Sequence, residues 1–389
     1  MVKWNNLLNR PNILAPIDKA KRACKSMRRK KMLLVLGIFV SLAMIPGCAP
    51  FVENNTIEDI APVSFWSISE GEKGKIKMST LVPPLVNEPK SLLTLEVDLL
   101  KQGGKDFNLR YYRELKVGQL RFFLIHEELA KQGIIQLINT LLTDYDVSQR
   151  MYLVIVKGNF DEYINRQAKK QENLDYYLYR MLRHYEINRQ GEMTIINLHE
   201  YKNKLFSPFS DPVLPVFKVA KDNFTYEGTA FFSNDKLIEM VTSTEDQIFQ
   251  LLDNDHYLSF FPISDLDVVI GHLRSRVNVD LDKNLSLVTI NVKLNGRIEE
   301  YRGNKNLLNG HELMQLHQEI ETELEMKTTD LIKKMQEQKV DPLEIGTHTL
   351  SPFSKPISEK VWLDAWGKME IKVNYQLHFE SLQNTKNNY

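Results

Sequence analysis

The stretch from Met27 to Cys48 constrains this chain most, because it decides on which side of a membrane the rest of the polypeptide lies. Four consecutive basic residues, 28–31, precede an apolar run of 14 residues from Met32 to Ile45, and the tripeptide Pro46-Gly47-Cys48 follows. A membrane-spanning helix needs about 20 apolar residues, whereas a shorter run behind a basic segment is typical of a secretory signal peptide. The pattern predicts a signal peptide over residues 1–47.

The residues around Gly47 and Cys48 match a lipobox, in which a peptidase cleaves before a cysteine that carries diacylglycerol. We therefore predict cleavage between Gly47 and Cys48 and lipid attachment to Cys48. Each buried methylene of the lipid adds about 0.8 kcal/mol to membrane binding, so the chain would stay tethered. The alternative is an uncleaved N-terminal anchor, in which Cys48 is an ordinary thiol. The sequence is compatible with a translation start at Met1 and with one at Met27. In each case the remaining chain lies outside the cytoplasm.

Composition excludes several classes of protein. Residues 1–47 hold ten of the 50 basic and one of the 50 acidic residues, so the rest carries 40 basic and 49 acidic residues and a net charge near −9. An acidic body argues against nucleic-acid binding, which needs clustered Lys and Arg. Cys24 is removed with the signal peptide, and Cys48 is then the only cysteine, which excludes disulfides and cysteine-based zinc sites.

The length of the chain predicts more than one domain. About 340 residues follow the signal peptide, which suggests two or three domains. Prolines at 208, 212 and 215 interrupt the periodic pattern and mark a boundary. The predicted organisation is a lipidated tether at 48–62, an N-terminal α/β domain at 63–207, a C-terminal α+β domain at 216–382 and a tail at 383–389.

Hydrophobic patterns predict the strands of the N-terminal domain. Extended runs at 63–68 and 76–81 flank a turn-rich connection, which is typical of a hairpin. An apolar strand at 119–125, a helix at 127–142 and a second apolar strand at 151–156 form a strand-helix-strand unit. Such a unit favours two parallel strands joined by a helical crossover.

Two more helices are predicted after this unit, at 160–170 and 174–185. The second helix is rich in tyrosine, at positions 176, 177, 179 and 185. These rings could form a ligand-stacking surface, but half-buried packing against the domain is the interpretation we favour.

The C-terminal domain combines a long helix with alternating strands. The helix is predicted at 311–338, where an apolar stripe lies opposite i,i+4 ion pairs, and the clearest strand is at 369–379. The other predicted elements are strands at 224–232, 236–241, 287–294 and 297–301, turns at 233–235 and Asn295-Gly296, and a helix from a cap at 242–244 to Leu252. The predicted fold class is α+β, with mixed sheets packed with helices in two or three domains and one long helix in the C-terminal half.

Motifs that carry chemistry are scarce. In the segment HELMQLH, His311 and His317 lie six positions apart, which turns the second about 240° around a helix and prevents both from binding one metal ion beside Glu312. The chain has no Walker A, GxGxxG or GxSxG motif, and Gly103-Gly104 indicates only a loop. We therefore predict no enzyme activity and no catalytic, metal-binding or cofactor-binding residue.

Several segments follow one another in a familiar order: the lipobox, QLRFFLIHEELAKQGIIQLI, SQRMYLVIVKGNFDEYI, GTAFFSNDKLIEM, INVKLNGRIEE, IKKMQEQKVDPLEIG and WLDAWGKMEIKVNYQLHF. This series resembles the GerAC-type lipoproteins, the C subunits of spore nutrient germinant receptors. The resemblance extends over about residues 63–379. It rests on order and spacing, since no single motif is diagnostic.

Cys48 matches the lipidated cysteine of that family. The other matching positions are Glu128, Gly133, Asp146, Arg150, Gly228, Phe231, Asp235, Lys236, Leu237, Lys334, Gln336, Asp341, Gly346 and Trp366. The resemblance implies structural roles for them, since the family has no known active site. The chain departs from the family pattern at 49–52, at 145–148 and after the last strand, where a glycine is missing. These departures concern the subtype rather than the fold.

The resemblance implies a lipid-anchored, non-enzymatic receptor subunit on the outer face of the spore inner membrane, with a mixed α/β fold. Such a subunit would assemble with two integral-membrane partners, an A-type and a transporter-like B-type subunit, and serve germination in response to nutrients. A solute-binding lipoprotein of a transporter is the alternative, although only the first half shows a clear strand-helix unit. An envelope hydrolase would need a nucleophile or metal motif, which the chain lacks.

Overall fold

The computed structural model describes Met32 and residues 58–83, 91–168, 174–221, 223–253, 256–350 and 355–379. The elements below all belong to the compact unit Thr56–Tyr389. Gly47, Cys48 and, apart from Met32, the whole predicted signal peptide lie outside the described residues, as does most of the predicted tether. Among the helices of the described ranges, none is both long and apolar enough to span a membrane.

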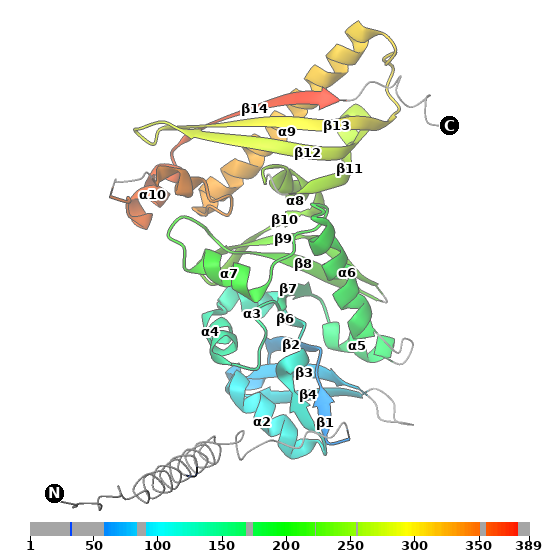
Figure 1. The fold of residues 1–389 in the computed structure, drawn as a ribbon, viewed down its shortest axis with the longest axis vertical. Coiled ribbons are helices and arrows are strands. Elements are labelled where there is room, and N and C mark those ends of the chain that lie inside the picture. Colours follow the sequence, from blue (N-terminus) through cyan, green and yellow to red (C-terminus); the bar gives the residue numbers. More distant parts are fainter. Residues whose placement is uncertain are drawn as a thin grey trace, which may run out of the picture. The chain divides into compact units, whose positions relative to one another are not determined.

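A sheet of eight strands forms the first part of this unit, in the order β10-β9-β8-β7-β6-β2-β3-β4 (Figure 1). Its strands are β2 (Phe65–Glu70), β3 (Ile76–Val82), β4 (Ser91–Val97), β6 (Phe122–His126), β7 (Tyr152–Lys157), β8 (Val213–Ala220), β9 (Asn223–Ser233) and β10 (Lys236–Thr242). The four central strands β2, β6, β7 and β8 are parallel, and the flanking strands are antiparallel to their neighbours. Two short strands, β1 (Ile60–Pro62) and β5 (Glu114–Lys116), pair separately.

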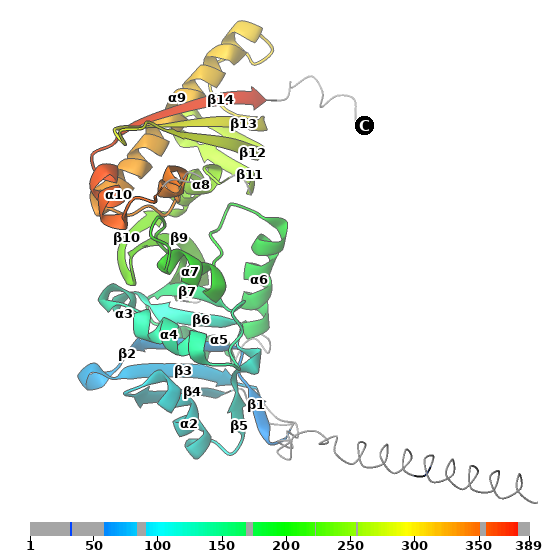
Figure 2. The same cartoon turned by 60° about the vertical axis from the view of Figure 1, so that its left-hand side comes forward.

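Helices cover both faces of this sheet, which explains why its central strands are apolar throughout. One face is covered by α2 (Leu100–Arg110), α3 (Glu127–Gln132), α4 (Ile135–Thr143) and α7 (Leu198–Leu205). The other is covered by α5 (Phe160–Ala168) and α6 (Leu174–Asn188). Figure 2 shows α3 and α6 on opposite sides of β6 and β7. Along β6, Phe123 and Ile125 face the first set of helices, whereas Phe122 and Leu124 face the second.

The predicted strand-helix-strand unit is present, with β6 and β7 parallel. The prediction of one helix at 127–142 is wrong, because the chain forms α3 and α4 with a break at Gly133. Gly133 has a φ of +118°, which other residues rarely adopt. Ile134 then donates its backbone N–H to the carbonyl oxygen of Asp235 (3.0 Å), and this tertiary bond redirects the chain.

Two further predictions for this region need correction. Tyr179 and Tyr185 pack against the core under α6 as predicted, but Tyr176 and Tyr177 are exposed because their side chains project from the outer face of the helix. Gly103-Gly104 does not form a loop and lies inside α2. A Cβ atom on Gly103 would lie 2.6 Å from the Met78 sulfur, so the glycine lets α2 approach β3 closely.

The eight-stranded sheet continues across the segment in which the sequence predicts a domain boundary. β7 lies before this segment, and β8, which pairs with β7, begins within it at Val213. β9 and β10 then extend the same sheet by antiparallel pairing. The division into domains at 63–207 and 216–382 stays a prediction.

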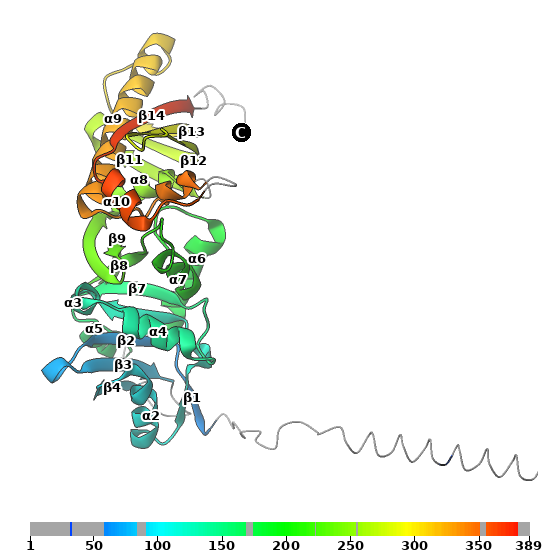
Figure 3. The same ribbon diagram turned by 90° about the vertical axis from the view of Figure 1, so that its left-hand side faces the viewer.

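A second sheet of four strands, in the order β11-β12-β13-β14, packs against a long helix (Figures 1 and 3). Its strands are β11 (Tyr257–Ile263), β12 (Val268–Leu281), β13 (Leu287–Tyr301) and β14 (Glu370–Phe379), and the helix is α9 (Gly310–Gln338). β11, β12 and β13 pair antiparallel, whereas β13 and β14 are parallel. The predicted α+β class, with mixed sheets and one long helix in the C-terminal half, is confirmed.

The predicted turn at Asn295-Gly296 is wrong, because β13 runs straight through it. Asn295 pairs with Arg274 of β12, and Gly296 lies where β12 has a bulge between Gly271 and Arg274. A Cβ atom on Gly296 would lie 2.9 Å from the Gly271 carbonyl oxygen. The glycine therefore allows a close approach of two strands and does not reverse the chain.

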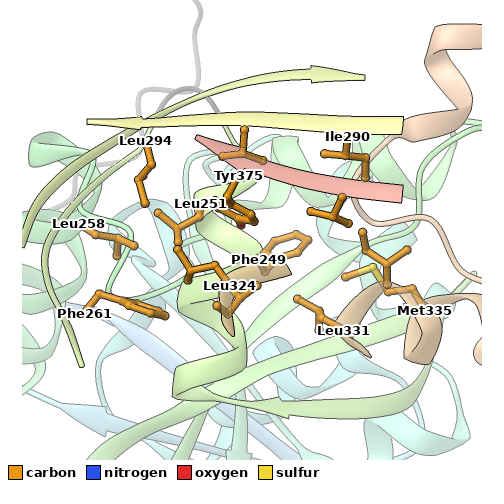
Figure 4. Close-up of a cluster of buried hydrophobic side chains, with 14 of the residues drawn as sticks. Phe249, Leu251, Leu258, Phe261, Ile290, Leu294, Leu324, Leu331, Met335 and Tyr375 are labelled. Atoms are coloured by element: carbon orange, nitrogen blue, oxygen red, sulfur yellow. The ribbon is translucent and has the colours of Figure 1, made fainter. Parts of the chain in front are cut away.

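The core of this second part lies between α9, the sheet and α8 (Ser243–Leu251), as Figure 4 shows. Leu324, Leu331 and Met335 come from the predicted apolar stripe of α9 and are buried. Phe249 of α8 and Tyr375 of β14 complete the cluster. Thr242 caps α8 with a reciprocal capping box to Glu245, as the predicted cap at 242–244 requires.

Candidate functional site

The turn between β9 and β10 binds the start of α4. The Asp235 carboxylate accepts the backbone N–H of Ile135 (3.0 Å), which places a negative charge at a helix N-terminus. A Cβ atom on Gly133 would lie 2.6 Å from an Asp235 carboxylate oxygen and 3.5 Å from Lys236. Three positions that match the family pattern, from two segments about 100 residues apart, therefore meet here.

Asp211 and Asp341 bind each other through their backbones and the Asp211 carboxylate. The backbone N–H of Asp211 donates to the Asp341 carbonyl oxygen (3.2 Å), and that of Asp341 donates to the Asp211 carboxylate (2.7 Å). The Asp341 carboxylate accepts the N–H groups of Ile345 (3.0 Å) and Gly346 (2.7 Å). This pair ties the segment before β8 to the segment after α9.

Three more matching positions near the C-terminus, Gln336, Gly346 and Trp366, gather beside Asp341. Trp366, at the end of α10 (Glu359–Trp366), donates its indole N–H to the Val340 carbonyl oxygen (2.8 Å). Gln336 donates to the carbonyl oxygens of Trp366 (2.7 Å) and Met369 (2.9 Å). Gly346 lies against the indole of Trp362, where a Cβ atom would be 2.7 Å from its nitrogen. Four residues that match the family pattern thus form one cluster: Gln336, Asp341, Gly346 and Trp366.

A cavity of about 260 Å³ opens at this point, and we call it the junction pocket. It is lined by Ser207, Ser210, Asp211, Asn234, Asp341, Glu359, Trp362 and neighbouring residues. Its lining thus comes from the segment before β8, the β9–β10 turn, the segment after α9, and α10. Its volume is below the usual range of about 300–1,000 Å³ for drug-sized ligands.

Burial makes the two aspartates of the junction pocket hard to ionise. Removal from water raises the pKa of the Asp341 carboxyl to about 7 and that of Asp211 to about 6. Backbone N–H donors act against this increase at both carboxyls. Lys204 lies nearby, with its ammonium 3.2 Å from the Pro342 carbonyl oxygen and bonded to Glu344. The junction therefore carries protons that titrate near neutral pH.

Another buried carboxylate, Asp246, binds α8 to β9. It is fully buried on α8 and accepts hydrogen bonds from Thr194 and Thr229 (both 2.7 Å) and from the Tyr226 hydroxyl. Burial raises the pKa of Asp246 despite these donors. The sequence predicted only that Asp246 lies in the helix that ends at Leu252. Its position one turn before Phe249 and Gln250 was the available signal of burial.

One partly buried cluster has the residue types of a hydrolase site, but its serine is not accessible to a substrate. The Ser67 hydroxyl lies 3.2 Å from His126 Nε2, and burial lowers the pKa of His126. Ser67 is only 2% exposed, so no substrate reaches its hydroxyl. The nearby Asp161 carboxylate is occupied by the Ser79 hydroxyl (3.0 Å) and the Lys77 ammonium (2.7 Å). The cluster fastens α5 to the sheet.

Other predicted positions lie apart from the junction pocket. Glu128 is exposed beside Lys131, and Lys334 forms an ion pair with Glu245 of α8. Asp146 and Arg150 lie in the connection between α4 and β7. The described part of the chain contains no group of three or more side chains placed to hold a metal ion. His317 of the HELMQLH segment packs its ring against Phe379.

Two family models match this chain in succession. The model for the spore germination protein N-terminal domain matches residues 53–219, and the model for the spore germination B3/GerAC-like C-terminal region matches residues 227–382. The chain belongs to the GerAC family of spore germination proteins. This is the family of the germinant receptor C subunits, and the resemblance read from the sequence is confirmed.

Two known proteins are similar to this GerAC-family chain over most of their length. The spore germination protein GerQC of Bacillus cereus is 22% identical over 358 residues, which cover 89% of this chain and 96% of that protein. The crystal structure of the GerBC protein matches with a TM-score of 0.51 at 15% identity, over 81% of this chain and 96% of that one. The second likeness shows a common fold.

Proposed function

We propose that this GerAC-family protein is the lipid-anchored, non-catalytic C subunit of a spore nutrient germinant receptor. The succession of both family models across residues 53–219 and 227–382 carries this proposal. The subunit would be anchored through Cys48 to the outer face of the spore inner membrane. There it would assemble with A-type and B-type integral-membrane subunits and contribute to germination in response to nutrients.

The contacts of the positions that match the family pattern support a binding role rather than catalysis. The positions that match the family pattern are engaged in helix caps, backbone bonds and indole packing, as at Asp235, Asp341 and Trp366. In the Ser67–His126 pair, the serine is only 2% exposed. We propose that the tether at 48–62 leads to the two predicted domains, 63–207 and 216–382, and that both domains lie outside the membrane.

Deletion of the gene tests the receptor role. In a spore-forming host, we expect spores of the deletion strain to keep their refractility on exposure to one class of nutrient, because one receptor lacks its C subunit. Calcium dipicolinate should still trigger germination, which shows that the downstream machinery is intact. The measurement is loss of refractility for single nutrients, with the restored gene as control. Normal responses to every nutrient would contradict the proposed role.

Replacement of Cys48 by alanine tests the anchor. Removal of the thiol removes the site of the thioether, so we expect the variant to leave the membrane fraction and to lose incorporation of labelled lipid. Cys24→Ala is the matched control, since Cys24 lies within the predicted signal peptide and should have no effect. A Cys48→Ala protein that stays in washed spore membranes would instead support an uncleaved N-terminal anchor.

A further inference from the structure

Three arginines and a histidine gather around one hollow of the described chain, which we call the basic pocket. The pocket has a volume of about 440 Å³, and its lining includes Arg189, His256, Tyr257, Arg274 and Arg276. Among the eight described residues that line it, none is an aspartate or glutamate. The chain after residue 47 carries 49 acidic and only 40 basic residues, so the gathering of three arginines in this lining contrasts with the acidic composition of the chain.

The backbone around the basic pocket is held by hydrogen bonds. Tyr257, the first residue of β11, donates its N–H to the Arg189 carbonyl oxygen and accepts the N–H of Gly191 (both 2.9 Å). Tyr257 also pairs with Arg274 in the β11–β12 register. Arg274 and Arg276 are two residues apart on β12 and therefore project from the same face of the sheet. Backbone hydrogen bonds thus hold Arg189, which directly follows α6, near the two arginines of β12.

The two arginines of β12 keep their hydrogen-bonding capacity. Arg274 lies over the Tyr257 ring, 5.8 Å from its centre. In the part of the chain that the structure describes, the guanidinium groups of Arg274 and Arg276 make no ion pair and no hydrogen bond. Across the β12–β13 register, Arg276 is directly opposite Lys293. Like charges in such a pair are destabilising, and a bound anion would offset their repulsion.

Among the described residues, no carboxylate forms an ion pair with Arg274 or Arg276. Asp253 lies 3.3 Å from the His256 ring, outside the pocket lining, and its side chain is half exposed. Asn295, which pairs with Arg274 on β13, contributes an amide rather than a charge. The pocket therefore offers two guanidinium groups, an amide and an aromatic ring to a ligand.

We propose that the basic pocket binds a small organic anion through a carboxylate or phosphate group. A guanidinium group presents paired N–H donors in a plane, which match the oxygen pairs of both groups. A volume of about 440 Å³ accommodates a small ligand. The inference rests on the pocket alone and is independent of the proposed role in germination.

Binding to the purified full chain in detergent tests this site. Inorganic phosphate and glutarate are titrated separately at constant ionic strength and followed by calorimetry. We expect at least one of them to bind saturably to the wild type, and phosphate alone or glutarate alone identifies the preferred group. Arg274→Gln with Arg276→Gln should weaken that binding at least ~tenfold, because two charge-assisted contacts are lost.

The control is a pair of exposed arginines outside the pocket, Arg110→Gln with Arg302→Gln, which removes the same charge and should leave binding unchanged. Arg274→Lys with Arg276→Lys keeps the charge but not the planar donor pairs, and should bind more weakly than the wild type. This lysine pair decides the question if the glutamine pair does not fold. The site is overturned if neither anion binds the wild type saturably, if the pocket variants bind like the wild type, or if the control pair weakens binding equally.

Discussion

Replacement of Gly228 by alanine is expected to lower the free energy of unfolding by about 4 kcal/mol or more. Gly228 lies in β9 with a φ of +150°, in a region that side chains with a Cβ atom rarely adopt. An added Cβ would lie 1.9 Å from the Val241 carbonyl oxygen and 2.8 Å from the carbonyl carbon of Thr242. Both contacts are with backbone, so the clash can be relieved only by separating β9 from β10.

The damage should extend beyond the two strands. Thr242 is the cap of α8, and Tyr226 and Thr229, on either side of Gly228, both bind the buried Asp246 of that helix. A shift of β10 would therefore disturb the contacts of Asp246, and a buried carboxylate that loses its donors is costly. The expected effect is a large part of the total stability of a domain, about 5–15 kcal/mol.

Gly104→Ala is the matched control for this prediction. An added Cβ on Gly104 meets no atom within 4 Å, and Gly104 lies within α2, where alanine favours the helix over glycine by about 1 kcal/mol. Denaturant unfolding, followed by tryptophan fluorescence, should show a stabilised Gly104→Ala protein and a strongly destabilised Gly228→Ala protein. Equal stability of Gly228→Ala and the wild type would mean that the two strands are farther apart than described.

The elements with a regular hydrophobic period were predicted closely from the sequence. The helix expected at 311–338 is Gly310–Gln338, and the strand expected at 369–379 is Glu370–Phe379. Each of them buries one face whose residue types repeat with the period of the element, so local sequence is sufficient. Along β12 the difference in burial between alternate side chains is smaller, since exposed Arg274 and Arg276 alternate with half-buried residues such as Val277. This strand was therefore not predicted.

Tertiary contacts explain what local patterns could not predict. The break between α3 and α4 depends on a bond from Ile134 to Asp235, and the straight course of β13 depends on close packing at Gly296. The sequence pattern singled out positions such as Asp341, but the contacts of these residues depend on partners far along the chain. Asp341 binds Asp211, which lies 130 residues earlier, and Asp211 matched no motif.

The pH dependence of stability should change when Asp341 is replaced by asparagine. Burial raises the pKa of the Asp341 carboxyl to about 7 in the folded chain, against an ordinary value of 3.8. A carboxyl with a raised pKa stabilises the fold fully below pH 3.8, and this contribution is lost as the pH rises through 7. The loss in the wild type has an upper bound of about 4 kcal/mol, from a shift of about three pKa units.

In Asp341→Asn this titration is absent, so the free energy of unfolding of the variant relative to the wild type should increase between pH 4 and pH 7. The amide can accept only one of the N–H groups of Ile345 and Gly346 through its oxygen, which costs about 1–3 kcal/mol at every pH and leaves the slope unaffected. Denaturant unfolding at several pH values measures the difference. Asp364→Asn, at an exposed position of α10, should follow the wild-type curve. If the curves of Asp341→Asn and the wild type ran parallel, Asp341 would remain ionised throughout, and the junction pocket would hold a charge rather than a proton.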